Sequence, residues 1–163
     1  MKTIIIFHSQ SGKTKQVAEK IKNSLSGDLV EVSPKQAYSS LMVYPKGCYR
    51  AMKGEVDDIN PEKIDVVEYD MVVIASPVWA GKPTPVINGA IKALNGCSGK
   101  KAWLFLTCGA ENSGKEAVPI FKARLEDMGL VVSGETVLDK THVHDQVVIE
   151  DLISKIRTVG DMA

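Results

Sequence analysis

The chain alternates short apolar segments with longer amphipathic segments, and this alternation constrains its fold more than any other sequence feature. Residues 3–8 read TIIIFH, and residues 69–76 read YDMVVIAS. Continuous apolar, β-branched runs of this length are typical of parallel strands that are covered on both faces. We therefore predict buried strands in these two places, and further strands over the segments 28–33, 101–108 and 130–138.

Apolar residues at helical spacing fill the first segment between strands. Val17, Ile21 and Leu25 recur every four residues, which predicts an amphipathic helix over residues 13–25. Strands that alternate with helices imply an α/β fold, in which a parallel sheet has helices on both faces. A length of 163 residues suits one such domain, which we predict to span residues 1–163.

Three further helices are predicted from the residues at which they begin. Thr84 is the expected N-cap of a helix over residues 84–96, with a proline at the first helical position. Ser113 opens the next helix at capping-box spacing, and Pro119 inside it predicts an irregular first turn or a later start. Asp145 is the expected N-cap of the last helix.

The segment 34–68 is long for a simple connection, and we predict that it contains one or two short helical pieces. It carries the basic residues Lys46, Arg50 and Lys53. Its aromatic residues either reach over a ligand site or cover the sheet, and the second interpretation is favoured.

Charge and cysteine content exclude several classes of protein. The chain has 20 basic and 20 acidic residues, and this balance argues against nucleic acid or an anionic membrane as a partner. Three cysteines without a CxxC pair indicate neither a disulfide framework nor a zinc site, and reduced thiols suit a cytoplasmic protein. His142 and His144 form an H-x-H pair, but no further ligand is evident, so loop histidines before Asp145 are favoured over a metal site.

The loop SQSGKT at residues 9–14 follows the first predicted strand. It looks like the end of a Walker A motif, but Phe7 stands where that motif requires its first glycine. The third strand ends in SPVW without a Walker B aspartate, so a P-loop phosphotransferase is disfavoured. The hydroxyls of this loop, its Gly12 and the first amides of the next helix suit a phosphate monoester without magnesium. The alternative is a loop that only caps the helix.

Two other loops follow strands at the same edge of the predicted sheet, where open parallel sheets bind their ligands. Residues 76–83 read SPVWAGKP and place Trp79 just past a buried strand, where an indole either stacks on a flat aromatic ligand or packs on a helix of the protein. Residues 107–114 begin with Thr107, Cys108 and Gly109, which either present backbone groups to a ring edge or form an ordinary turn. Cys108 is expected to be a buried thiol at the end of its strand.

In this order, the three loops resemble those of the flavodoxin family. The resemblance covers nearly the whole chain, although the third loop matches in position only. The family's hydroxyl-rich loop matches Ser9, Gln10, Ser11, Gly12, Lys13 and Thr14, its SPVW-x-G loop matches Pro77, Val78, Trp79, Ala80 and Gly81, and its third loop matches Thr107, Cys108 and Gly109.

The resemblance implies a flavodoxin-like three-layer sandwich with a five-stranded parallel sheet of order 2-1-3-4-5. It also implies FMN as a non-covalent cofactor, with its phosphate on residues 9–14, Trp79 against the isoalloxazine, and the other two loops at the ring edge. The expected function is a low-potential electron carrier between redox proteins, present as a monomer or weak homodimer, without nucleic-acid or membrane partners. The alternative is an FMN-dependent NAD(P)H:quinone-type oxidoreductase. The neutral charge departs from the acidic carriers of the family, and the third loop lacks an aromatic residue over the flavin.

Overall fold

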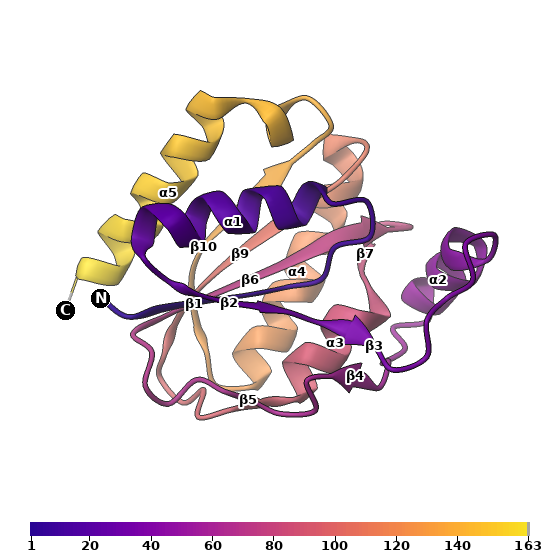
Figure 1. Ribbon diagram of the computed structural model, residues 1–163, viewed down its shortest axis with the longest axis horizontal. Helices are drawn as coiled ribbons and strands as arrows, with labels where there is room; N and C mark the ends of the chain where they lie inside the picture. Colours follow the sequence, from indigo (N-terminus) through magenta and orange to yellow (C-terminus); the bar gives the residue numbers. More distant parts are fainter. Residues whose placement is uncertain (163) are drawn as a thin grey trace.

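The core of the protein is one sheet between two layers of helices (Figure 1). The computed structural model describes residues 1–162. The long strands lie in the order β10-β9-β6-β1-β2 and all pair in parallel, which confirms the predicted order 2-1-3-4-5. These strands are β1 (Thr3–Phe7), β2 (Asp28–Glu31), β6 (Met71–Trp79), β9 (Lys101–Thr107) and β10 (Val131–Leu138).

Each face of the sheet is covered by a pair of helices. Successive side chains of a strand point to opposite faces, so Ile4 and Ile6 of β1 belong to one apolar core, and Ile5 and Phe7 belong to the other. The first core lies under α3 (Pro85–Lys92) and α4 (Glu111–Asp127), and the second lies under α1 (Lys13–Leu25) and α5 (Gln146–Asp161). This arrangement is the predicted three-layer α/β fold.

The segment between β2 and β6 leaves the body of the protein and returns to it. Its helix α2 (Val43–Met52) projects beyond the edge of the sheet in Figure 1 and confirms the predicted helical piece. Short strands fix both ends of this excursion, because β3 (Ser33–Pro34) pairs with β4 (Ile59–Asn60), and β5 (Ile64–Asp65) pairs with β8 (Leu94–Asn95). These short strands were not predicted from the sequence.

Two predicted helix boundaries are wrong. α4 begins at Glu111 rather than at or after Ser113, and it continues through Pro119 because Phe121 and its neighbours on the buried side hold it against the sheet. Ser113 does not cap this helix; its hydroxyl donates a hydrogen bond to the carbonyl oxygen of Ala110 at 2.7 Å. α3 ends at Lys92, earlier than predicted, because the next residues enter β8.

The other two helix caps agree with the sequence. The Thr84 hydroxyl accepts the amide of Ile87 at 3.2 Å, and the Asp145 carboxylate accepts the amides of Val147 and Val148. Among residues 1–162, no helix is both long enough and apolar enough to cross a membrane.

Candidate active site

Three loops meet at the carboxyl edge of the sheet, at the ends of its central strands. The first loop follows β1 and leads into α1, the second follows β6, and the third follows β9 and leads into α4. β1 lies between β2 and β6 in the sheet. The chain therefore adds β2 on one side of β1 and all later long strands on its other side, so the strand order switches direction at β1. Such a switch point is where open α/β sheets bind their ligands. The fold therefore brings the three predicted segments to one edge.

A buried hydrogen bond joins the first loop region to the third. The hydroxyls of Thr14 and Thr107 lie 2.8 Å apart, and these residues are only 1% and 6% exposed. The Thr14 hydroxyl is thus engaged inside the protein, and the amide of Thr14, rather than its side chain, lies at the start of α1.

A second buried contact joins the first loop region to the second. The imidazole Nδ1 of His8 lies 2.9 Å from the hydroxyl of Thr84, the N-cap of α3. Ser76 strengthens this connection, because its hydroxyl accepts the amide of Thr84 at 3.1 Å and donates to the carbonyl of Pro77 at 2.7 Å. Burial lowers the pKa of His8 to about 4, so its ring is neutral at physiological pH.

The first loop has the features of an anion cradle. Gly12 is the N-cap of α1 at φ 88°, and a Cβ built there would meet nothing within 4 Å, so the space over it is open. Within residues 1–162, the amides of Lys13 and Thr14 have no acceptor, whereas the amide of Lys15 reaches the Ser9 hydroxyl at 3.3 Å. Free amides at the positive end of a helix dipole suit a phosphate. The residues present therefore fit the phosphate group of a flavin mononucleotide.

The second loop is a tight hairpin rather than an open loop. β6 runs through Trp79, pairs with β7 (Lys82–Pro83), and turns at Ala80 and Gly81, which have φ angles of 50° and 71°. Positive φ at both central residues is typical of two-residue hairpin turns that match the twist of the strands. Trp79 is therefore the last residue of its strand. The prediction that it lies just past the end of the strand is wrong.

The indole of Trp79 is covered by α2. Only 4% of Trp79 is exposed, and it shares an apolar cluster with Val43 and Ala51 of that helix. Gly47 lets α2 approach this closely, because a Cβ on Gly47 would lie 2.4 Å from the indole ring. From the sequence alone, Trp79 could stack on a ligand or pack on a helix. In this structure it packs on a helix, and its stacking on a flavin stays a prediction.

Three aromatic rings surround this indole edge to face. The ring centroids of His8, Tyr38 and Tyr44 lie 5.7, 6.0 and 6.1 Å from that of Trp79. Such T-shaped contacts are favourable because the positive edge of one ring meets the negative face of another. Trp79 therefore links the residue that follows β1, the segment before α2, and α2 itself.

The third loop is partly open to solvent. Cys108 is half-buried, and burial raises the pKa of its thiol, so it is a poor nucleophile at neutral pH. Gly109 is exposed, and a Cβ there would meet nothing within 4 Å. Cys108 was expected to be a buried thiol at the end of its strand, but it is half-buried and lies one residue after β9.

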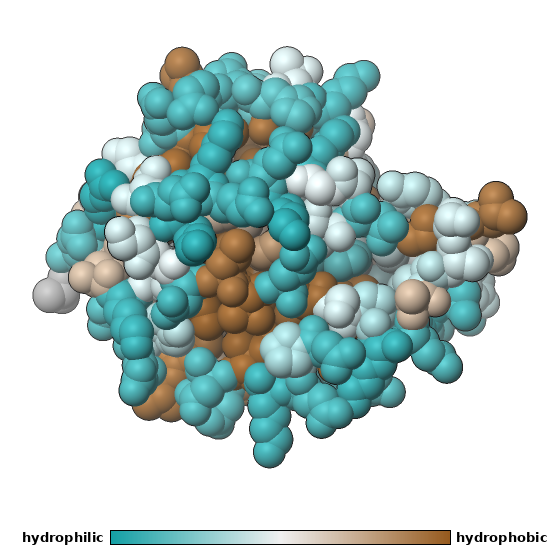
Figure 2. Space-filling view, viewed as in Figure 1, coloured by the Kyte–Doolittle hydropathy of each residue, from teal (hydrophilic) through white to brown (hydrophobic). Residues whose placement is uncertain are grey.

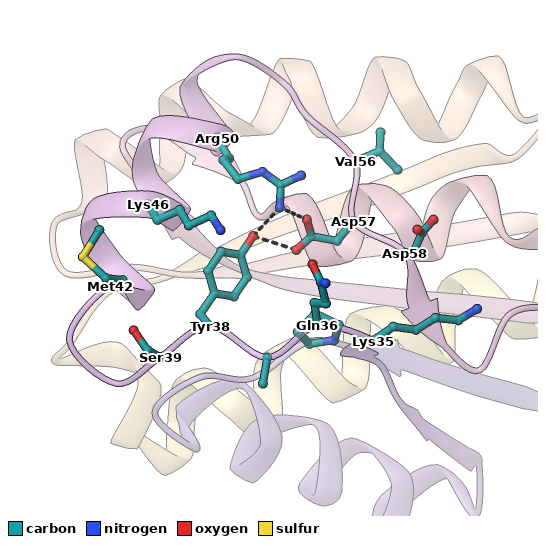
Figure 3. A pocket seen from close by; sticks show the side chains of 12 residues that line it. Lys35, Gln36, Tyr38, Ser39, Met42, Lys46, Arg50, Val56, Asp57 and Asp58 are labelled. Atoms are coloured by element: carbon teal, nitrogen blue, oxygen red, sulfur yellow. Dashed lines mark hydrogen bonds and ion pairs between the residues drawn. The ribbon is translucent and has the colours of Figure 1, made fainter.

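A partly buried ionic network holds the α2 segment against the body of the protein (Figure 3). The Tyr38 hydroxyl donates to the Asp57 carboxylate at 2.7 Å and accepts from the Arg50 guanidinium at 2.9 Å. Arg50 also pairs directly with Asp57 and Glu55. Burial, together with the hydrogen bond to Asp57, raises the pKa of Tyr38 to about 12.

This network forms one wall of a cavity of about 680 Å³. The cavity lies between the segment before α2, α2 itself and the residues after it, and Figure 3 shows the side chains of Lys46 and Met42 at its rim. Tyr38 lines this cavity and also contacts Trp79, so one side chain connects the cavity to the hairpin of the second loop. This cavity was not predicted from the sequence.

Sequence reasoning also missed His8 and Gly47. His8 stood within a predicted strand and was not considered as a site residue, although a polar residue at the carboxyl end of a buried strand is a usable signal. Gly47 lies within a helix, where glycine is unfavourable, and this conflict was the available signal of a close approach.

Among residues 1–162, no group of histidine, cysteine and acidic side chains is suited to hold a metal ion. The imidazole of His142 instead lies 3.1 Å from the carboxylate of Asp139.

Comparison with known proteins agrees with this geometry. A family model described as flavodoxin matches residues 2–147. The chain belongs to the flavodoxin family. No curated protein sequence matches it.

Solved flavoprotein structures share the fold of this flavodoxin-family chain. A flavoprotein from Bacteroides uniformis superimposes with a TM-score of 0.78 at 19% identity, over 94% of this chain and 97% of that chain. One from Bacteroides eggerthii gives 0.77 at 23% identity, over 96% and 98%. A flavoprotein from Lactobacillus acidophilus, solved in complex with FMN, gives 0.67 at 27% identity, over 87% and 95%. The protein thus has a flavodoxin-like flavoprotein fold.

Proposed function

We propose that the protein binds FMN at the edge formed by its three loops and acts as an electron carrier. The observation that carries the proposal is the pair of buried contacts, Thr14 to Thr107 and His8 to Thr84, which holds the first loop against the other two. Such preorganisation is what a preformed cofactor site needs. The FMN complex of the Lactobacillus flavoprotein supports the choice of flavin.

Different residues of the chain would bind the phosphate and the ring system of FMN. The free amides of Lys13 and Thr14 and the exposed hydroxyl of Ser11 would hold the phosphate, and backbone groups of residues 77–81 and 107–109 would face the ring edge. FMN, when bound, supplies electron transfer in one-electron or two-electron steps. The protein's part is to orient the cofactor and set the polarity around it.

A titration with FMN tests this proposal directly. We expect FMN to bind, with its visible spectrum altered and its fluorescence quenched, and riboflavin to bind at least tenfold more weakly because it lacks the phosphate. Binding of ATP with magnesium, together with an unchanged flavin spectrum, would show that the assignment is wrong.

A second candidate function has a specific observation in its favour. The cavity beside Tyr38 is large enough for a small acceptor and connects through Tyr38 to the Trp79 hairpin. This cavity would suit the alternative function, an FMN-dependent NAD(P)H:quinone-type oxidoreductase. Steady-state NAD(P)H oxidation with a quinone separates the two, since a carrier is expected to turn over only when a separate reductase is added.

A cytoplasmic location is part of the same proposal. Cys48, Cys97 and Cys108 are free thiols, which are typical of reducing compartments. Cell fractionation with labelling of free thiols tests this expectation, and recovery of the protein from an oxidising compartment would contradict it.

A further inference from the structure

Helix α2 is apolar on both sides, although only one side is covered. Its inner side packs on Trp79 through Val43, Gly47 and Ala51. The opposite side, with the turn before the helix, forms what we call the outer α2 face. This face consists of Leu41, Met42, Pro45, Tyr49 and Met52, which are spaced to share one side of a helix and are all exposed.

The exposure of this face is unusually high for apolar residues. Leu41 is 87% exposed, Met52 is 63% exposed and Tyr49 is 55% exposed. Figure 2 shows hydrophobic residues at the outer end of the projecting α2 region, next to polar neighbours. Exposed apolar patches bordered by polar residues mark interaction sites, and methionine and tyrosine are enriched at the centres of protein interfaces.

The charge of the same segment is one-sided. Residues 35–54 contain the basic residues Lys35, Lys46, Arg50 and Lys53 and no acidic residue, whereas the whole chain is neutral. Arg50 and Lys35 are paired with carboxylates at the base of the segment. Lys46 and Lys53 have no carboxylate partner within residues 1–162, and both flank the outer α2 face, where Lys53 lies 4.6 Å from the Tyr49 ring centroid.

The outer α2 face is also close to the predicted redox site. Tyr44 lies on the edge of the helix between its outer and inner sides and is 52% exposed. Its ring contacts Trp79 edge to face, at 6.1 Å between centroids. A protein that covers this helix would therefore touch an aromatic side chain in direct contact with the second loop.

We propose that the outer α2 face is the docking surface for an acidic redox protein. The inference rests on the proposed electron-transfer function, and it commits to a partner with a small apolar centre and surrounding carboxylates. Lys46 and Lys53 would face those carboxylates, and opposite charges across an interface speed encounter and select the partner. The outer α2 face and its two lysines give this neutral protein a local basic docking site.

A second copy of the chain fits this surface poorly. A symmetric dimer would bring the same face of both subunits together, so Lys46 and Lys53 would approach their own counterparts with no carboxylate from residues 35–54 to compensate. An anionic membrane would also attract lysines beside apolar residues, and binding to vesicles is therefore one outcome of the test below.

The test measures binding of an acidic plant-type [2Fe–2S] ferredoxin by calorimetry at 20 mM and 300 mM NaCl, with basic cytochrome c as a second probe. The charge variant is the double substitution Lys46→Glu and Lys53→Glu. Its matched control is Lys22→Glu with Lys63→Glu, which makes the same change in net charge at exposed lysines elsewhere. The apolar variant is Tyr49→Ser, and its control is Val147→Ser at a position that is 74% exposed on α5.

We expect ferredoxin binding at low salt that weakens at least tenfold at high salt and at least tenfold in the charge variant, but less than threefold in its control. Tyr49→Ser should weaken binding at least fivefold, and Val147→Ser should not. FMN affinity is measured separately for every variant and should be unchanged, so a failure of FMN binding counts against the proposed function and not against docking.

Three results would overturn the docking proposal. The first is no binding of ferredoxin to the unaltered protein, or stronger binding of cytochrome c. The second is binding to vesicles of anionic phospholipid that the charge variant abolishes while ferredoxin does not bind. The third is self-association in sedimentation experiments that Tyr49→Ser removes.

Discussion

His8 and Trp79 meet edge to face, with ring centroids 5.7 Å apart and ring planes at 83°. His8 directly follows β1, and Trp79 is the last residue of β6, the strand that pairs with β1, so the contact joins the carboxyl ends of two paired strands. Both residues are nearly inaccessible to solvent. The contact makes the ends of these strands one rigid unit at the edge where the loops begin.

The buried His8 predicts a loss of stability in acid. Burial lowers its pKa from 6.5 to about 4, so the unfolded chain binds a proton more readily than the folded protein between these values. Stability should therefore fall as the pH drops from 6.5 to about 4, by roughly 3 kcal/mol at about 1.4 kcal/mol per pKa unit. Urea unfolding of the unaltered protein and of His8→Gln across this range measures the effect.

Carboxylates also titrate in this range, so the difference between the two proteins isolates the histidine. The variant should show a shallower pH dependence, whereas His144→Gln, at an exposed position, should follow the unaltered protein. Parallel curves for His8→Gln and the unaltered protein would contradict a buried neutral His8.

A methyl group at Gly47 should push α2 away from the indole. The Cβ of Gly47→Ala would lie 2.4 Å from Trp79, and overpacking of this kind costs about 1–3 kcal/mol. Better helix propensity returns up to about 1 kcal/mol, so we expect a net loss of about 1–2 kcal/mol in the free energy of unfolding. In a Trp103→Phe background, the emission of Trp79 should shift to longer wavelength as water reaches it.

Gly109→Ala provides the control for Gly47→Ala, since a Cβ at Gly109 meets nothing within 4 Å. This substitution should change the free energy of unfolding by no more than about 0.5 kcal/mol. It should leave the tryptophan emission unchanged. An unshifted spectrum for Gly47→Ala would mean that α2 does not cover Trp79 in solution.

The hydrogen bond between Thr14 and Thr107 should appear as a coupling in a double-mutant cycle. Thr14→Val or Thr107→Val alone leaves one buried hydroxyl without its partner, which costs about 1–3 kcal/mol. The double variant removes both hydroxyls and should lose less than the sum of the single losses. Urea unfolding of the four proteins measures this, and strict additivity would show that the two hydroxyls do not interact.

The hairpin turn at Ala80 predicts opposite effects at neighbouring positions. Ala80 has φ 50°, a conformation that is costly for residues with a Cβ, so Ala80→Gly should be neutral or stabilise by up to about 1 kcal/mol. Gly81 has φ 71°, a conformation in which a side chain is strained, so Gly81→Ala should destabilise the protein. Thermal unfolding of the pair tests the turn, and the reverse order of stabilities would refute it.

The network around Tyr38 predicts one late-titrating tyrosine. Burial and the Asp57 carboxylate raise the pKa of Tyr38 to about 12, so its phenol should ionise well above the usual value near 10. Because the raised pKa favours the protonated phenol in the folded state, stability gained from Tyr38 is lost as the pH rises from 10 to 12. Absorbance near 295 nm follows the ionisation, and Tyr38→Phe should remove the last step, whereas Tyr49→Phe should not.

Much of the fold followed from the sequence because its signals are local. β1 is a continuous apolar run, and a strand with no polar side must be covered on both faces. The stripe Val17 and Ile21 orients α1 on the sheet, and Thr84 starts α3 with its own side chain. The boundaries of α4 did not follow, because long-range packing of Phe121 outweighs the local effects of Ser113 and Pro119.

The sequence by itself determined the layers and the three loop segments that meet at one edge, since hydrophobic periodicity and loop composition depend on neighbouring residues, whereas the strand order was implied by the resemblance to the flavodoxin family. Only the tertiary structure decided the partners of those segments. The burial of Trp79 under α2 and the bond between Thr14 and Thr107 join residues far apart in the chain. Such contacts depend on how whole helices and strands pack against one another, and no local sequence pattern specifies that packing.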